Sequence, residues 1–143
     1  MGLNVAQKAS EVLCSDSNEY VDEIFDSCAD SLPQESQDRV FFENLSAEEA
    51  VIQGQCERAE VMIVDPPRRG LDRGVLDLLM NKHASAKAKD LKKLIYISCG
   101  FDALEKDTRE LLSSGYWKIK SADGFVMFPG SDHIETVAVF DRT

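Results

Sequence analysis

A chain of 143 residues, with 43% hydrophobic and 29% charged residues, has the length and composition of one small globular domain. These proportions exclude a disordered chain, and the lack of any apolar run of about 18 residues excludes a membrane-spanning helix. The net charge of −10 is uneven: residues 1–60 hold 14 acidic and 3 basic residues, whereas residues 61–143 hold 12 and 13. No strong nucleic-acid footprint follows from this balance.

Cysteine spacing and the first residues bear on metal binding and location. Cys14, Cys28, Cys56 and Cys99 are not spaced as a zinc site, and neither histidine lies near them in sequence, so we expect no metal. Free or buried thiols in a reducing compartment are favoured, although a disulfide between Cys14 and Cys28 stays open. Residues 1–9 lack the apolar block of a secretory signal. We expect an intracellular protein, in the cytoplasm, the nucleus or an organelle, without a membrane partner.

The first elements are helical and acidic. Mixed residues at 4–14 suggest a short helix, and apolar residues at helical spacing predict a second helix over 18–30, capped by Asp16 or Ser17. A loop with Pro33 follows, and residues 1–38 are expected to form an acidic helical N-terminal segment. A short strand is predicted at 39–43. A capping box, Ser46 with Glu49, then opens a further helix.

The pattern changes after residue 60. Val61–Val64 is a compact, β-branched apolar run that predicts a strand buried on both faces. A helix is expected over 71–80, a polar connection over 81–93 and a second buried strand at 94–97. A helix over 101–113, ended by Gly115, precedes a strand at 116–121, a loop at 125–133 and a last strand at 135–140. Alternating strands and helices predict an α/β fold with a mostly parallel sheet and an antiparallel C-terminal strand.

Polar residues directly follow two of the predicted strands. Asp65-Pro66-Pro67-Arg68 ends one strand and Ser98-Cys99-Gly100 ends the next. Ligands of parallel α/β sheets bind beyond the carboxyl ends of the strands, so Asp65 and Cys99 face one crevice if the strands are neighbours. Taken alone, a cysteine in that place favours a structural role.

Three segments together resemble the RNA uracil-5-methyltransferases, which form 5-methyluridine in transfer and ribosomal RNA. The D-P-P-R-x-G-L motif of that family corresponds to residues 65–71, its S-C-N-P motif to 98–101 and its F-P-x-T-x-H-x-E segment to 128–135. The three occur in the family's order with apt spacing. Residues 39–143 are therefore expected to be the C-terminal part of a methyltransferase catalytic domain, with a truncated Rossmann-like class I methyltransferase fold.

The resemblance implies a role for each candidate site residue. Cys99 matches the thiolate that adds to carbon 6 of uracil, so that carbon 5 can attack the methyl group of S-adenosylmethionine. Glu135 matches the general base that then removes the proton from carbon 5. Asp65 and Asn44 match cofactor contacts, and Arg68 is a candidate phosphate contact. Without the resemblance, Glu135 reads as a surface carboxylate, Asn44 as a helix N-terminal signal and Arg68 as the partner of a local acid.

Two departures from the family keep a second function open. Gly100-Phe101 stands where the family has Asn-Pro, which puts the geometry of the cysteine loop in question. The glycine-rich turn that holds the methionine end of the cofactor is not found, since Gly2 and Gly54 are isolated. The chain is thus expected to be an RNA uracil-5-methyltransferase acting on tRNA or rRNA, or a non-catalytic methyltransferase-like module that acts as a partner or scaffold.

The resemblance also predicts an open sheet edge. In the family's sheet, the strand at 61–64 pairs with a strand that this sequence lacks, and exposed edges invite association. Three expectations follow: the acidic N-terminal segment covers the edge, a second chain pairs there, or the chain is a fragment of a longer product.

Overall fold

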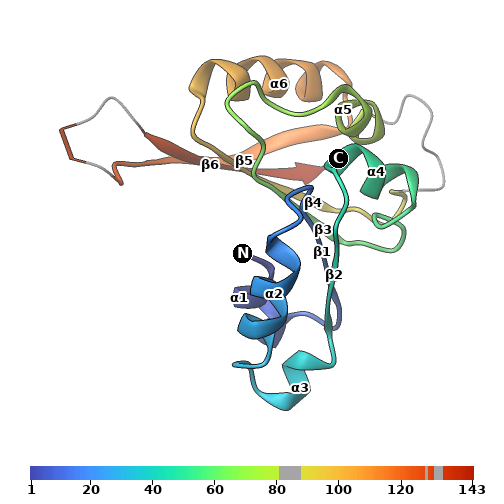
Figure 1. The fold of residues 1–143 in the computed structure, drawn as a ribbon. Helices are drawn as coiled ribbons and strands as arrows, with labels where there is room; N and C mark the ends of the chain where they lie inside the picture. The colour runs from blue at the N-terminus through green and yellow to red at the C-terminus, as the bar shows by residue number, and fades with distance from the viewer. Residues whose placement is uncertain (81–87, 128, 131–133) are drawn as a thin grey trace. The chain divides into compact units, whose positions relative to one another are not determined.

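The computed structural model describes residues 1–80, 88–127, 129–130 and 134–143 (Figure 1). The chain divides into two compact units, Met1–Gln55 and Cys56–Thr143, and each is described by itself. This boundary lies after Gln55, whereas the division predicted from the sequence lies after residue 38. The assignment of residues 39–143 to the catalytic domain stays a prediction.

The first unit is built around two parallel strands. β1 pairs with β2 from Val12 opposite Val40 to Ser15 opposite Glu43. A helix was expected over 4–14, but its second half is a strand, because Val12 and Cys14 turn inward with a period of two. Such a short run cannot be told from a helix by its pattern. The elements of this unit are α1 (Gly2–Val5), the 3₁₀ helix η1 (Ala6–Lys8), β1 (Val12–Ser15), α2 (Val21–Ala29), α3 (Gln34–Gln37), β2 (Val40–Glu43) and α4 (Ala47–Ile52).

Local hydrogen bonds explain where the helices of this unit begin. The predicted capping box is confirmed, because the Ser46 hydroxyl accepts from the Glu49 amide at 3.2 Å and the Glu49 carboxylate accepts from the Ser46 amide at 2.9 Å. Asp16 does not cap α2. Its carboxylate accepts from the Asn18 amide at 2.8 Å in a turn ahead of the helix. Phe25 of α2 stacks on Phe42 of β2 with ring centroids 5.1 Å apart.

The second unit is a four-stranded sheet in the order β3-β4-β6-β5. β3 and β4 pair in parallel, and β6 runs antiparallel to both of its neighbours. Three strands therefore run one way and the C-terminal strand runs the other, which confirms the predicted α/β sheet. Its elements are β3 (Val61–Val64), α5 (Arg73–Leu79), β4 (Lys93–Ser98), α6 (Phe101–Ser113), β5 (Trp117–Phe125) and β6 (Glu135–Arg142).

Both helices of this unit cover the same face of the sheet (Figure 1). Leu94 and Tyr96 of β4 and Phe140 of β6 are fully buried on that face, because residues two apart along a strand point the same way. Leu79 of α5 and Leu111 of α6 are buried as well, so helices and sheet share one core. After α6, Gly115 has a φ of +78°, the left-handed conformation that commonly ends a helix.

The burial predicted for the strand at 61–64 is wrong. The strand was expected to be buried on both faces, yet Val61 is 48% exposed and Ile63 is 36% exposed. The physical reason is that Val61 and Ile63 point away from the helices, because Met62 and Val64 are the residues that pair with the buried Leu94 and Tyr96. β3 is also at the end of the four-stranded sheet, and only β4 flanks it among the strands that the structure describes. β3 is therefore an apolar edge strand.

Some predicted features fall partly outside the described residues. These are residues 81–87 of the expected polar connection and, within the third motif, Phe128 and residues 131–133. Phe125, the expected start of a loop, is instead the last residue of β5. No helix among the described residues has the length and apolar character needed to cross a bilayer.

Candidate active site

Three candidate residues lie at the same end of the strands in the second unit's sheet. Val64, the last residue of β3, pairs with Tyr96 near the end of β4. Asp65 and Cys99 each follow their strand by one residue, so both lie at the carboxyl ends of these parallel strands. β6 starts with Glu135 at the same end of the sheet. The structure thus brings Asp65, Cys99 and Glu135 to neighbouring strand ends, as the carboxyl-end rule predicts for Asp65 and Cys99.

Cys99 and Glu135 lie at the same end of the β4–β6 ladder. The last paired residues of this ladder are Ser98 of β4 and Thr136 of β6. Cys99 follows Ser98 in the turn after β4, and Glu135 is the residue before Thr136 at the start of β6. Both residues are partly exposed, so a thiol and a carboxyl group are accessible to a ligand at this end of the sheet.

A compact turn carries Cys99. The Ser98 hydroxyl accepts from the Gly100 amide at 3.1 Å and donates to the Gly100 carbonyl at 3.0 Å. A side chain at position 100 would meet the neighbouring loop, because an ideal β-carbon there is 2.9 Å from the Arg68 carbonyl oxygen and 3.2 Å from the Arg68 α-carbon. Glycine at this position therefore lets the cysteine turn pack against the loop that follows β3.

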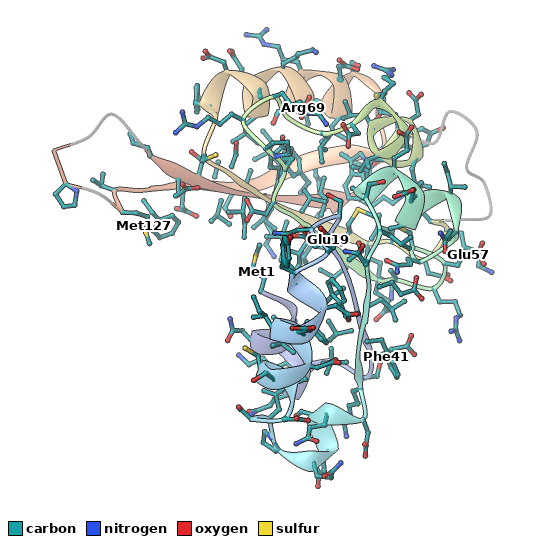
Figure 2. All side chains as sticks on the ribbon, viewed as in Figure 1. Met1, Glu19, Phe41, Glu57, Arg69 and Met127 are labelled. Atoms are coloured by element: carbon teal, nitrogen blue, oxygen red, sulfur yellow. The ribbon has the colours of Figure 1, made fainter. Side chains whose placement is uncertain are left out.

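The loop after β3 holds Asp65 and Arg68 at the surface. Two prolines follow Asp65 and stiffen the exit from the strand, because each fixes its own φ. Arg68 presents its backbone to Gly100, while the residue as a whole is exposed. Arg69, on the same loop in Figure 2, pairs with Asp72 at 2.9 Å on an exposed surface.

Sequence reasoning gave no role to a buried acid behind these loops. Asp107 of α6 is 2% exposed, and its Oδ2 accepts from the Leu71 amide and from the Tyr96 hydroxyl, both at 2.8 Å. Burial raises the pKa of the Tyr96 hydroxyl well above its ordinary value, and Asp107 raises that pKa further, so the phenol stays a neutral donor. A signal was present, because Asp107 shares the inward-facing stripe of α6 with Leu104 and Leu111.

Asn44 lies in the first unit, at the carboxyl end of the β1–β2 pair. Its Nδ2 donates to the backbone carbonyl of Asp16 at 2.9 Å, which ties together the two strand ends. Both residues are exposed. Asp16 was predicted from the sequence only as a helix cap. It therefore adds a carboxylate-bearing residue next to Asn44 at this strand end. A carboxylate at the end of a parallel strand is the kind of group that binds ribose hydroxyls.

Each unit carries polar groups at the carboxyl ends of its own parallel strands, where nucleotides bind in open α/β sheets. These groups are a carboxylate and an amide at Asp16 and Asn44 in the first unit, and a carboxylate at Asp65 in the second. Over the ranges that the structure describes, no group of three or more His, Cys, Asp or Glu side chains is placed to hold a metal ion.

Solved structures define the class of this fold. The tRNA (uracil-54, C5)-methyltransferase of Pyrococcus abyssi, solved with S-adenosyl-L-homocysteine, matches 97% of this chain and 31% of its own with a TM-score of 0.73 and 24% identity. The precorrin-6y C5,15-methyltransferase of Geobacter metallireducens matches 93% of this chain and 67% of its own, with a TM-score of 0.60 and 11% identity. The fold is that of the class I S-adenosylmethionine-dependent methyltransferases.

Sequence comparison narrows the class to one family. The family model described as tRNA (Uracil-5-)-methyltransferase matches residues 23–143. An uncharacterised RNA methyltransferase of Protochlamydia amoebophila is 36% identical over 142 residues, which cover 99% of this chain and 34% of that protein. The chain belongs to the tRNA (uracil-5-)-methyltransferase family. It spans about a third or less of the length of the curated relatives that it matches.

Proposed function

We propose that the chain carries the uracil-reacting part of an RNA uracil-5-methyltransferase, which methylates uridine in tRNA or rRNA through a covalent cysteine adduct. One observation supports this above the others. The pairing of β4 with β6 ends one residue before a partly exposed thiol, Cys99, and one residue after a partly exposed carboxyl group, Glu135, so both lie at the same end of the sheet. Addition to a pyrimidine and removal of a proton from the adjacent carbon need such a pair.

Cys99 begins the proposed reaction. Its thiolate sulfur forms a bond to carbon 6 of the uracil ring, and the electron pair of the 5,6 double bond moves toward the carbonyl at carbon 4. Carbon 5 becomes nucleophilic as a result. The target base must leave its stack to reach a half-buried thiol in a turn between two loops, which costs a few kcal/mol.

Glu135 completes the reaction in this proposal. Once carbon 5 carries the methyl group, the Glu135 carboxylate removes the remaining proton from that carbon. The released electron pair restores the 5,6 double bond, the bond from carbon 6 to sulfur breaks, and Cys99 returns to its thiolate form. The base must lie within hydrogen-bond reach of that proton. The place of Glu135 at the start of the strand next to β4, at the end where Cys99 lies, supports this role.

Asp65, Asn44 and Asp16 are the proposed cofactor contacts, and Arg68 is the proposed contact to an RNA phosphate. S-adenosylmethionine, when bound, supplies an electrophilic methyl group. Asp65 is an exposed carboxylate one residue beyond β3 and beside the end of β4, which suits a group that lies between the cofactor and the target base. Asn44 and Asp16 suit the adenine and ribose by their place after parallel strands.

Covalent trapping tests the reaction. RNA that carries 5-fluorouridine has no carbon 5 proton for Glu135 to remove, so the adduct should persist when S-adenosylmethionine is present. We expect a denaturation-stable complex whose RNA is attached to the peptide containing Cys99. Cys99→Ser should abolish it, whereas Cys28→Ser, at an exposed cysteine of α2, should leave it unchanged. No adduct with a good substrate RNA at saturating cofactor would argue strongly against the proposal.

A second candidate is a non-catalytic module that serves as a partner or scaffold. The apolar edge strand β3 favours it, since its outer backbone groups face no other strand among the described residues and Val61 and Ile63 add exposed apolar side chains. The edge would then take a second copy of the chain or another protein. Titration calorimetry with S-adenosylmethionine separates the candidates, because a scaffold that has lost the cofactor site releases no binding heat. Sub-millimolar binding by the chain would rule out that loss.

A further inference from the structure

One buried acid contacts the loop that carries Asp65 and the strand that leads into the Cys99 turn. Asp107 contacts the loop after β3 through the Leu71 amide and contacts β4 through the Tyr96 hydroxyl, three residues before Cys99. We name this group of four residues the Asp107 clamp; its members are Asp107, Tyr96, Leu71 and Gly70. The clamp lies within the second unit, on elements that are close only because β3 and β4 pair and α6 packs over them.

Gly70 shows how closely the loop backbone approaches the acid. An ideal β-carbon at this position would be 2.6 Å from Asp107 Oδ2 and 3.3 Å from the Ala103 β-carbon. Gly70 also has a φ of +89°, a left-handed conformation that other residues rarely adopt. The backbone after Arg69 therefore bends directly onto the carboxylate, and the Leu71 amide donates to it.

The loop is held at three points in sequence. Val64 is fixed by pairing with Tyr96, the Arg68 backbone packs against Gly100, and Leu71 is bonded to Asp107. Asp65 lies between the first two points and Cys99 adjoins the second. Loss of the hydrogen bond from Leu71 to Asp107 therefore frees the part of the loop that packs against the cysteine turn.

We propose that Asp107 is a positioning residue, whose hydrogen bonds to Leu71 and Tyr96 hold the Asp65 loop against the Cys99 turn. This inference rests on the proposed function, in which Asp65 and Cys99 must keep fixed positions around the same uracil ring. The carboxylate is well suited to the task. A buried carboxylate that accepts from two donors makes hydrogen bonds stronger than those between neutral groups, and it is costly to leave unpaired.

Limited trypsin digestion of the full chain tests the clamp without reference to activity. Trypsin cleaves after Arg68 and Arg69, which are exposed but lie beside buried Gly70, and after Arg109 within α6. Cleavage tracks the population of locally opened chains. In Asp107→Ala, cleavage after Arg69 should rise roughly tenfold relative to cleavage after Arg109, because a charged hydrogen-bond acceptor is lost.

Three further variants separate positioning from general destabilisation. Asp107→Asn keeps an oxygen acceptor and should restore most of the protection. Tyr96→Phe keeps the buried ring and removes one donor, so the rise should be smaller, roughly threefold. Leu111→Ala, at a buried residue one turn further along α6, should raise cleavage at Arg69 and Arg109 together. An unchanged ratio in both Asp107→Ala and Tyr96→Phe would overturn the proposal.

The functional consequence has its own readout. With 5-fluorouridine RNA at saturating concentration, Asp107→Ala should form the Cys99 adduct at least tenfold more slowly, while RNA affinity is retained and Asp107→Asn recovers the rate. A clamp that only stabilised the fold would instead lower the fraction of active protein and leave the rate of that fraction unchanged. If the wild-type chain forms no adduct, the proposed function fails, and the digestion ratios still decide whether the clamp exists.

Discussion

Ser98 and Gly100 decide how Cys99 is presented. The serine hydroxyl closes the turn through both backbone groups of Gly100, and the missing β-carbon of Gly100 admits the Arg68 backbone. The family's Asn-Pro at this place would hold the loop by other means, since asparagine bonds to nearby backbone and proline fixes φ. The departure from the family's motif is therefore compatible with an ordered cysteine turn.

Glu135 should control release of the product rather than formation of the adduct. Glutamine keeps the shape of the side chain but cannot take up the carbon 5 proton, so Glu135→Gln should accumulate adduct with ordinary RNA. Its turnover should fall by roughly 10²–10⁴. Gel mobility under denaturing conditions measures the adduct. Glu105→Gln, at an exposed acid of α6, is the matched control. An adduct that forms and disappears at the wild-type rate would contradict the role of Glu135.

Cys56 should make the second unit less stable in alkali. Burial raises the pKa of this thiol from 9.0 to about 11, so the unfolded chain ionises first and is favoured as the pH rises. Between pH 9 and about pH 11, the free energy of unfolding should fall by up to about 1.4 kcal/mol per pH unit. Urea midpoints, followed through the single buried Trp117, measure this loss. A Cys56→Ala variant with the same pH slope would show that another group is responsible.

At the scale of elements, β3 is the strand whose surroundings differ most from its sequence. Its four apolar residues form an edge with side chains exposed on one face, whereas its neighbour β4 has one face fully buried. Exposed apolar edges with unpaired backbone groups are templates for further strands. The short length of β3 and the prolines after it limit how far such pairing can extend.

A charge on β3 should block pairing at this edge. If the edge associates, the wild-type chain should sediment as larger species with rising concentration, and Ile63→Lys should remain monomeric, because a buried unpaired ammonium is costly. Ile119→Lys, on the other edge strand β5 where the side chain is 46% exposed, is the matched control and should not change association. A wild-type chain that stays monodisperse and monomeric at all concentrations would contradict self-association at β3.

Charge is distributed unevenly over the whole molecule. The acidic excess belongs to residues 1–60, while residues 61–143 are nearly balanced. RNA binding releases counterions in proportion to the number of phosphates that Lys and Arg contact. An RNA-binding surface should therefore be confined to the second unit, and the first unit should oppose binding at low salt.

Arg68 should contribute one phosphate contact. Arg68→Ala should lower RNA affinity to a similar extent for all sequences, and should reduce the slope of log affinity against log salt by about 1. Arg69→Ala is the matched control, because it removes the adjacent exposed cation from the same loop. Filter binding over a range of salt concentrations gives both slopes. Equal slopes for Arg68→Ala and the wild-type chain would remove Arg68 from the interface.

The sequence by itself determined the local elements and the motifs. The strand at 61–64, the helix over 101–113 and the Ser46–Glu49 capping box occur as predicted, because strand runs, helical periodicity and caps depend on residues a few positions apart. The motif order also indicated the family before any fold was known. The roles assigned to Cys99 and Glu135 remain proposals.

Only the tertiary structure decided which distant residues meet. The exposure of Val61 and Ile63 depends on which face of the sheet the helices cover, and the placement of Cys99 and Glu135 at the same end of the sheet depends on the pairing of β4 with β6. The burial of Asp107 depends on α6 packing over the loop after β3 and over β4, which are far apart in the chain. Local patterns show which side of an element is apolar, but they do not contain the identity of its neighbour, because pairing and packing join residues that are distant in sequence.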